Sequence, residues 1–187
     1  MPLLGICRNF IALIIKKSNN ILTFCFFIFM MEIDRYDRNL LQLLQKDGRM
    51  SNQELAEHIG LSPSPCLRRV RALEEAGIIS GYHAKLDPRR LGLTLTALIH
   101  VVMDRHTPER FAQFEAAIGD IPEVVECLLM TGQTADYQLR AVVRDMDAYQ
   151  ILLLQHITRI SGVSGVQTSF VLRQTGNAVG VPVSSIE

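Results

Sequence analysis

The chain has 187 residues, which is enough for one or two modest domains that each bury a hydrophobic core. It carries 19 basic and 19 acidic residues, so there is no global positive field, and any contact with nucleic acid must come from a local patch. Its four cysteines form no CxxC pair or other metal-ligand spacing, which indicates a reduced, intracellular protein without a disulfide framework.

The first thirty residues differ in composition from the rest of the chain. They contain no acidic residue, three basic residues and five of the eight phenylalanines. Their apolar runs, 10–15 and 21–31, are shorter than the roughly 18 residues of a membrane span, and no signal-peptide cleavage site follows them. A globular pattern begins directly after Met31, so we expect residues 1–30 to be translated upstream sequence, with the natural start at Met31 or Met30. A membrane-attached protein is the alternative if this stretch is present and inserted.

A first helix is predicted over residues 32–47. Asp34 is placed to cap its N-terminus, and Gly48 is placed to end it. Apolar residues recur at helical spacing and form one stripe, which consists of Tyr36, Leu40, Leu43 and Leu44. We expect this helix to pack behind the next two helices rather than to touch bases.

Two further helices are predicted within residues 51–79, and a very tight turn joins them. Ser51 and Glu54 have the spacing of a capping box, and Gly60 stands where a left-handed residue ends a helix most cheaply. Ser62 is placed to cap the next helix, whose first turn contains two prolines. Helices joined by so short a connection must cross rather than run antiparallel, so this stretch is predicted to be a helix-turn-helix.

The second of these helices has an apolar face and a basic face. Cys66, Val70 and Leu73 cluster on one side and should face the core. The opposite side is polar and basic in the half that a recognition helix presents to the major groove, where arginine can bond guanine and serine can meet a base or a phosphate. A solvated helix face is the alternative. The residues predicted to contact DNA are Ser51, Ser62, Ser64, Arg68, Arg69 and Arg71.

The segment after Gly77 is predicted to form a short β-hairpin, because residues with strand character lie on both sides of Gly81. The domain is therefore expected to be winged. Three basic residues follow, Lys85, Arg89 and Arg90, and they either meet the phosphate backbone or belong to a solvated linker.

A second domain is predicted after the linker, with the element order β-α-β-β-α-β. Its strands are expected at 94–103, 124–130, 136–143 and 163–172, and its helices at 107–119 and 146–160. In this ferredoxin-like arrangement two helices cover one face of a four-stranded antiparallel sheet. The other face would be bare, and such a face needs a partner or a ligand. The predicted fold class is therefore α+β, with domains at 33–94 (helix-turn-helix at 52–71) and 95–174 and a turn-rich tail at 175–187.

Residues 33 to about 94 resemble the DNA-binding domain of the Lrp/AsnC family, the leucine-responsive or feast/famine transcription regulators. The most specific match is the run Leu-Ser-Pro-x-Pro-Cys followed by Arg-Val-x-x-Leu-Glu, at residues 61–74. Further matching residues are Asp34, Asp37, Leu40, Leu41, Leu44, Gly48, Arg49, Gly81 and Tyr82. The resemblance continues to nearly the end of the chain and does not cover the first thirty residues.

This resemblance implies that the second domain is an ACT-like domain for effector binding and oligomerisation, whose sheets associate in pairs. It implies a homo-oligomer, either a dimer or an octamer built from dimers. It also implies that the effector is a small molecule, namely an amino acid, and that no cofactor is required.

The family's effector loop lies between the second and third strands and reads Gly-x-x-Asp followed by an aromatic or aliphatic residue. This chain has one residue more between Gly132 and Asp136. Loop N–H groups near Gly132 could hold a carboxylate, and Asp136 could pair with an ammonium group. A plain hairpin turn, with the glycine at positive φ and the aspartate bonding the turn backbone, is the alternative. The residues predicted to bind the effector are Gly132, Thr134, Asp136 and Tyr137.

Together these features predict a cytoplasmic, sequence-specific transcription regulator that binds double-stranded DNA as a two-fold oligomer and responds to a small molecule. No catalytic constellation or glycine-rich phosphate loop is found, which argues against an enzyme. The five histidines have no HExxH spacing and no close cysteine pair, so no metal site is predicted. The competing hypothesis is a metabolic enzyme or amino-acid-binding module in which the helix-turn-helix only serves packing.

Overall fold

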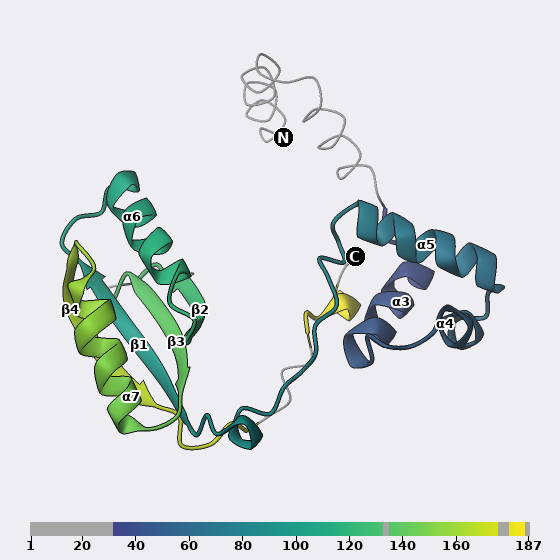
Figure 1. Cartoon of the computed structure of the whole chain (residues 1–187). Coiled ribbons are helices and arrows are strands. Elements are labelled where there is room, and N and C mark those ends of the chain that lie inside the picture. The colour runs from purple at the N-terminus through teal and green to yellow at the C-terminus, as the bar shows by residue number, and fades with distance from the viewer. Residues whose placement is uncertain (1–31, 133–134, 176–179, 186–187) are drawn as a thin grey trace, which may run out of the picture. The chain divides into compact units, whose positions relative to one another are not determined.

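The structure is a computed structural model that contains two compact units (Figure 1). The residues that it describes are 32–132, 135–175 and 180–185. The helical unit consists of the described residues up to Ala84 together with the C-terminal segment 180–185, and the sheet unit begins at Lys85 and ends at residue 175. The expectation that residues 1–30 are upstream sequence lies outside the described residues.

Three helices build the helical unit, and capping residues explain where they begin and end. Their bounds are α3 (Arg35–Lys46), α4 (Asn52–Ile59) and α5 (Pro63–Glu75). The Asp34 carboxylate accepts hydrogen bonds from backbone N–H groups of the first turn and so caps α3. Ser51 and Glu54 form the predicted capping box of α4, and Gly60 ends that helix with a φ of 70°.

The hydrophobic core of the helical unit contains residues of all three helices. Its buried helical members are Leu40 and Leu41 of α3, Leu55, Ala56 and Ile59 of α4, and Cys66, Val70 and Leu73 of α5. The α5 residues are the three that helical spacing predicted. Val183, from the C-terminal segment, is also buried in this core.

The β-hairpin predicted after Gly77 is not formed in the described part of the chain, so this prediction was wrong. Residues 78–88 contain no strand, and most of their side chains are exposed. The N–H groups of Ile78 and Ile79 instead both donate to the Leu73 carbonyl and close the end of α5. A two-stranded hairpin without a packed face is marginal in water, which explains why these strand-forming residues stay outside any sheet.

The sheet unit confirms the predicted ferredoxin-like arrangement. Its four strands form one antiparallel sheet in the order β2-β3-β1-β4. The strands are β1 (Leu95–Met103), β2 (Val124–Leu129), β3 (Tyr137–Val143) and β4 (Val163–Phe170). The helices are α6 (Pro108–Gly119) and α7 (Met146–Ile151), which continues as a π-helical turn at Leu152–His156 and a 3-10 turn at Ile157–Arg159. Both helices lie against the same face of the sheet (Figure 1).

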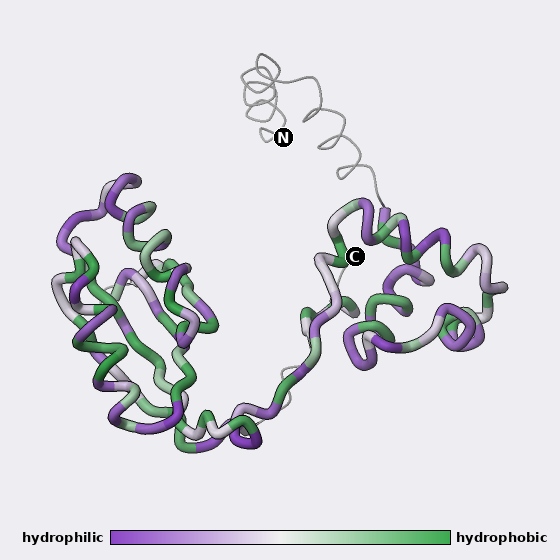
Figure 2. The backbone as a smooth tube through the Cα atoms, viewed as in Figure 1, coloured by the Kyte–Doolittle hydropathy of each residue, from purple (hydrophilic) through white to green (hydrophobic). Residues whose placement is uncertain are grey.

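Side chains of the central strands alternate between the covered face and the open face of the sheet. Those facing the helices are buried, namely Ala97, Ile99 and Val101 of β1 and Tyr137, Leu139 and Ala141 of β3. They form one core with Phe114, Ile118, Tyr149, Leu152 and Ile157 of the two helical segments. Figure 2 shows the corresponding mixture of hydrophilic and hydrophobic residues along the helices. No described helix covers the opposite face, on which Leu98 and Val142 are only half-buried.

Candidate nucleic-acid interface and effector loop

The helix-turn-helix is closed by hydrogen bonds at both ends of its turn. The Leu61 N–H donates to the Ala56 carbonyl at 2.9 Å, which continues the C-terminal cap of α4 into the turn. The Asn52 side chain, at the start of α4, donates to the Pro63 carbonyl at 2.8 Å. The first residues of α4 and α5 are therefore joined directly, which fixes the start of α5 against the rest of the motif.

The outer face of α5 carries the predicted basic residues on its surface. Ser64, Arg68 and Arg71 are exposed. Within the described part of the chain, neither arginine forms an ion pair or a side-chain hydrogen bond. Both guanidinium groups are therefore available to an external acceptor, and Arg68 lies one turn of helix from Ser64, so the three side chains share one face.

The two serines predicted to begin the helices differ in their bonding. Ser51 is used in its capping box, because its hydroxyl accepts from the Glu54 N–H and its own N–H donates to the Glu54 carboxylate. Ser62 holds the N-cap position of α5, but its exposed side chain makes no capping hydrogen bond. Pro63 and Pro65 have no N–H, so Ser64 supplies the free N–H in the first residues of α5, and the Ser62 hydroxyl stands at the N-cap of the same helix, where helix geometry favours an anion.

Arg69 lies in a different environment from the other two arginines of α5. Its guanidinium meets Asp34 Oδ2 at 2.9 Å and Asp37 Oδ1 at 2.9 Å, and it lies over the Tyr36 ring. Asp37 is 4% exposed, and it is the one buried charged residue in the described part of the chain. Burial lowers the pKa of Arg69, but its hydrogen bonds and charge interactions with the two carboxylates raise that pKa by more, so the net shift is upward. This guanidinium therefore links α5 to the N-terminus of α3.

Arg69, Asp34 and Asp37 are among the residues that carry the family resemblance, but their interaction was not predicted. Burial raises the pKa of Asp34, but hydrogen bonds from the backbone N–H groups of Asp37 and Tyr36 and the charge of Arg69 lower it more, so the net shift is downward. Asp34 and Asp37 stand three residues apart and so lie on one side of the first turn of α3. That spacing, opposite a basic helix, was the only signal in the sequence.

The effector loop, which joins β2 to β3, is tied to the end of β1. The Met130 N–H donates to the Asp136 carbonyl, and the Asp136 N–H donates to the Val101 carbonyl. The Asp136 carboxylate accepts from the Met103 N–H at 2.7 Å and lies 2.7 Å from His106 Nε2. Asp136 therefore anchors the loop to β1. This role differs from both predictions for Asp136, which were a ligand contact and a bond to the backbone of its own turn.

The other predicted effector residues are placed as follows. Gly132 is exposed, has no left-handed φ and has open space around it, so the turn does not require glycine at this position. Thr134 lies outside the described residues. Tyr137 is buried between Phe111 and Phe114, and its hydroxyl donates to Glu115 at 2.7 Å. Burial and the neighbouring Glu115 carboxylate raise the pKa of Tyr137 far above its usual value.

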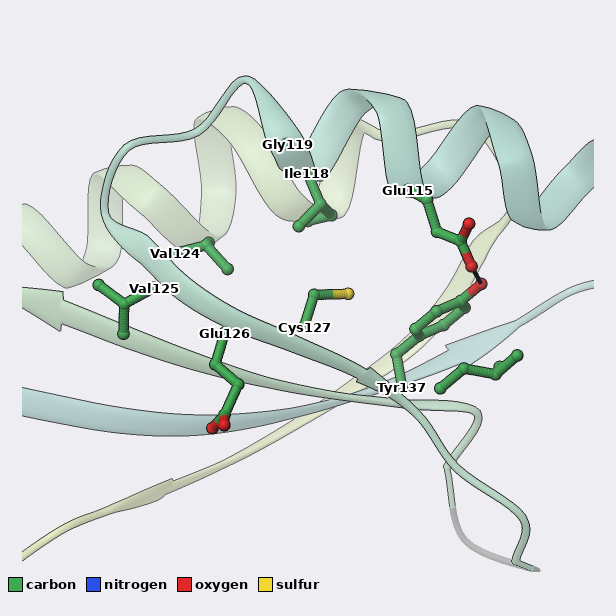
Figure 3. A pocket seen from close by; sticks show the side chains of 9 residues that line it. Glu115, Ile118, Gly119, Val124, Val125, Glu126, Cys127 and Tyr137 are labelled. Atoms are coloured by element: carbon green, nitrogen blue, oxygen red, sulfur yellow. Dashed lines mark hydrogen bonds between the residues drawn. The ribbon is translucent and has the colours of Figure 1, made fainter. Parts of the chain in front are cut away.

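A hollow of about 340 Å³ lies between α6 and β2 beside this loop (Figure 3). Ile118 and Val124 contribute apolar surface to it, and the Glu115–Tyr137 hydrogen bond lies at one end. Its volume is within the range of small-molecule sites. Burial and the nearby Glu115 charge raise the pKa of the Cys127 thiol, so this cysteine has no thiolate character at neutral pH.

The described residues contain no group of three or more His, Cys, Asp or Glu side chains placed to hold a metal ion. They also contain no helix that is long and apolar enough to cross a membrane.

Comparisons with known proteins agree with both units. Residues 33–80 match the family model "Winged helix-turn-helix DNA-binding", and residues 96–178 match "Lrp/AsnC ligand binding domain". The first unit therefore belongs to the winged helix-turn-helix class, as predicted, although its described residues 78–88 form no strand.

Relatives of known function are similar over most of their length. The leucine-responsive regulatory protein of Salmonella typhimurium is 45% identical over 143 residues, which cover 76% of this chain and 87% of that protein. The Bkd operon transcriptional regulator of Pseudomonas aeruginosa is 45% identical over 144 residues, which cover 77% of this chain and 94% of that protein.

Solved structures show the same fold. A transcriptional regulator of Neisseria meningitidis in complex with L-Met has a TM-score of 0.77 and 39% identity, covering 81% of this chain and 97% of that one. An AsnC family transcriptional regulator from Agrobacterium tumefaciens also has a TM-score of 0.77, with 33% identity and coverage of 82% and 99%.

Proposed function

Because the chain belongs to the Lrp/AsnC family of DNA-binding transcription regulators, we propose that it binds its operator through α5 as a two-fold dimer and that an amino acid adjusts this binding. The related proteins are regulators rather than enzymes. The observation that carries the proposal is the pair of exposed arginines on α5, Arg68 and Arg71, which have no partner within the described part of the chain.

The proposed contacts divide into base contacts and phosphate contacts. Arg68 and Arg71 reach guanine edges in the major groove, with Ser64 beside them. Ser62 and Ser51 lie at the starts of α5 and α4, where hydroxyl and N–H groups favour phosphate oxygens. For Arg69, which was also predicted to contact DNA, the pairing with Asp34 and Asp37 favours a role in positioning α5.

Self-association is proposed through the open face of the sheet. Leu98 and Val142 are half-buried there without a covering helix, and a hollow of about 690 Å³ lies between this face and the segment before β1. Arg140, which lines this hollow, is paired with Glu126 at 3.2 Å. A two-fold dimer through this face places two recognition helices on successive turns of DNA, which requires a roughly palindromic operator. An octamer would be an assembly of such dimers.

The effector is proposed to be an amino acid held beside the loop between β2 and β3. Its carboxylate would meet loop N–H groups near Gly132, and its ammonium group would meet Asp136. A carboxylate offers about four lone-pair positions, so the two hydrogen bonds of Asp136 leave capacity for a ligand. The apolar surface of the adjacent hollow, to which Ile118 and Val124 contribute, suits an amino acid with an apolar side chain.

A gel shift with the full chain tests this function. The DNA comes from upstream of the protein's own gene, competitor DNA is present, and a panel of amino acids is added at one fixed salt concentration, because affinity for DNA depends steeply on salt. We expect a shift that survives the competitor and changes with one apolar amino acid, through linkage between the two binding events. A competitor-resistant shift that ignores every amino acid would contradict the effector proposal alone. The proposed site of action is the cytoplasm.

A further inference from the structure

The C-terminal segment 180–185 belongs to the helical unit, although the chain reaches it directly from the sheet unit. Val183 is 3% exposed and lies in the core that contains Leu40 and Leu41 of α3. The two matched family regions end at residues 80 and 178, so neither includes this segment. A buried anchor outside both matched regions requires an explanation, because a segment without regular structure orders only when contacts hold it.

Gln45, near the end of α3, recognises the backbone of this segment. Its side-chain Nε2 donates to the Val181 carbonyl at 3.3 Å, and its Oε1 accepts from the Val181 N–H at 2.6 Å. One amide side chain therefore satisfies both backbone groups of one residue, as a neighbouring β-strand would. The Val181 side chain itself is 69% exposed, so the recognition at this position depends on the backbone alone.

The anchor side chain stands two residues further along. Val181 is exposed and Val183 is buried in the core, and the Val183 N–H donates to the Val181 carbonyl at 2.8 Å, so a tight turn at Pro182 directs the anchor inward. Backbone bonds at Val181 supply affinity, and the buried site of Val183 supplies specificity. A further hollow of about 280 Å³ adjoins the segment and is lined by Leu41 and Leu44 of α3 and by Ile79 of the segment after α5.

The sequence of the segment fits this groove. Gly180 has a φ of +60°, a backbone conformation that favours glycine, and a Cβ at that position would displace the end of the Gln45 side chain. Pro182 restricts the backbone between the paired residue and the anchor, which lowers the entropy lost on docking. The Ser185 N–H donates to the Pro182 carbonyl and closes the segment into a turn.

We propose that residues 180–185 are a docking peptide that completes the helical unit, and that the surface of α3 around Gln45 is its binding site. The ligand class is a short, turned segment of the form Gly-x-Pro-Val, supplied by residues 180–183 of the same chain. The chain thereby connects the helical unit to the sheet unit twice, once through the residues after Ala84 and once through this segment. Docking stabilises α3 and limits the freedom of the helix-turn-helix that packs on it.

A matched pair of substitutions in the full chain tests the docking. Val183→Asp places a charge in the buried anchor site, whereas Val181→Asp places the same charge on an exposed side chain two residues away. We expect amide hydrogen exchange in the last turn of α3 to become about tenfold faster or more in the first variant and to stay within about twofold of the wild type in the second. Gln45→Ala should give a smaller increase in the same amides.

A peptide experiment covers the case in which Val183→Asp disturbs the core more widely. A chain that ends at Gly176 is mixed with a fluorescent peptide of residues 177–187. We expect saturable binding to the shortened chain, at least tenfold weaker binding to the full chain, whose groove is already filled, and no binding of a peptide that carries Val183→Asp. Equal exchange rates in the two aspartate variants, or a shortened chain that binds no peptide, would overturn the proposal. Neither readout involves DNA or an amino acid, so these results are separate from those of the proposed function.

Discussion

Arg69 on α5 holds Asp37 on α3 through a hydrogen bond of 2.9 Å, and the same guanidinium pairs with Asp34 at 2.9 Å. The helix proposed to enter the major groove is therefore attached to the start of the helix behind it by two charged contacts, one of them to a buried carboxylate. Three arginines of α5 thus fall into two groups: Arg68 and Arg71 face outward, and Arg69 faces the protein.

Removing either outward-facing arginine should lower the affinity for DNA without lowering the stability of the protein. Arg68→Ala and Arg71→Ala should each weaken specific binding by about 1–3 kcal/mol, because each removes a proposed guanine contact. The thermal midpoint should stay at the wild-type value, since neither side chain has a partner in the described part of the chain. Arg105→Ala, an exposed arginine of the sheet unit, is the control. Unchanged operator binding in both α5 variants would show that the proposed face is wrong.

Removing the inward-facing Arg69 should instead lower the stability of the helical unit. Arg69→Ala should destabilise the helical unit by about 2 kcal/mol, because the buried Asp37 carboxylate loses its charged partner. Arg69→Lys should recover only part of this, since one ammonium group cannot reproduce the two-pronged geometry of a guanidinium. Urea unfolding of both variants and of Arg68→Ala provides the measurement. If Arg69→Ala and Arg68→Ala are equally stable, the pairing contributes nothing to folding.

The pH dependence of stability follows from Asp34. Burial opposes ionisation of this carboxyl, but backbone hydrogen bonds and Arg69 together hold its pKa below the ordinary value of 3.8. A depressed pKa contributes stability that is fully present above the unfolded value and is lost as the pH falls through the folded value. The helical unit should therefore have constant stability from neutral pH down to about 5 and lose stability below about 4. Asp34→Asn should flatten this acid limb in unfolding curves recorded between pH 3 and pH 7, and an unchanged limb would exclude Asp34 as its source.

The effector loop can be tested by separating its two roles. Asp136→Ala removes the acceptor of the Met103 N–H and should destabilise the sheet unit by about 1–2 kcal/mol, whereas Asp136→Asn keeps an acceptor and should cost less. Both variants should bind DNA normally in the absence of an amino acid, and both should lose the amino-acid response, because both lose the charge proposed for the ligand ammonium. The readouts are thermal unfolding and operator titration with and without the amino acid. A normal response in Asp136→Asn would return the loop to a purely structural role.

Local rules predicted the parts of the fold that depend on neighbouring residues. The capping box at Ser51 and Glu54, the left-handed Gly60 and the buried face of α5 each follow from spacing within one or two turns of helix. The sheet order followed from the sequence of elements, because few topologies join β-α-β-β-α-β compactly.

The features that sequence reasoning missed all depend on contacts between distant residues. A basic residue at position 69 looks the same on a helical wheel whether a phosphate or Asp37 faces it. The burial of Val183 depends on a groove that only the folded helical unit creates. Residues 78–88 have strand character, but a strand needs a partner, and the described part of the chain supplies none.

Selection from a pool of random duplex DNA is the most direct test of the central claim that α5 reads the operator through Arg68 and Arg71. The wild-type full chain and an Arg68→Ala, Arg71→Ala double variant are selected in parallel at the same salt concentration. The wild type should enrich a roughly palindromic sequence whose half-sites lie one or more helical turns apart, about 10 base pairs or a multiple, and the double variant should not enrich it. Enrichment of the same sequence by both proteins, or no enrichment by the wild type, would contradict the claim.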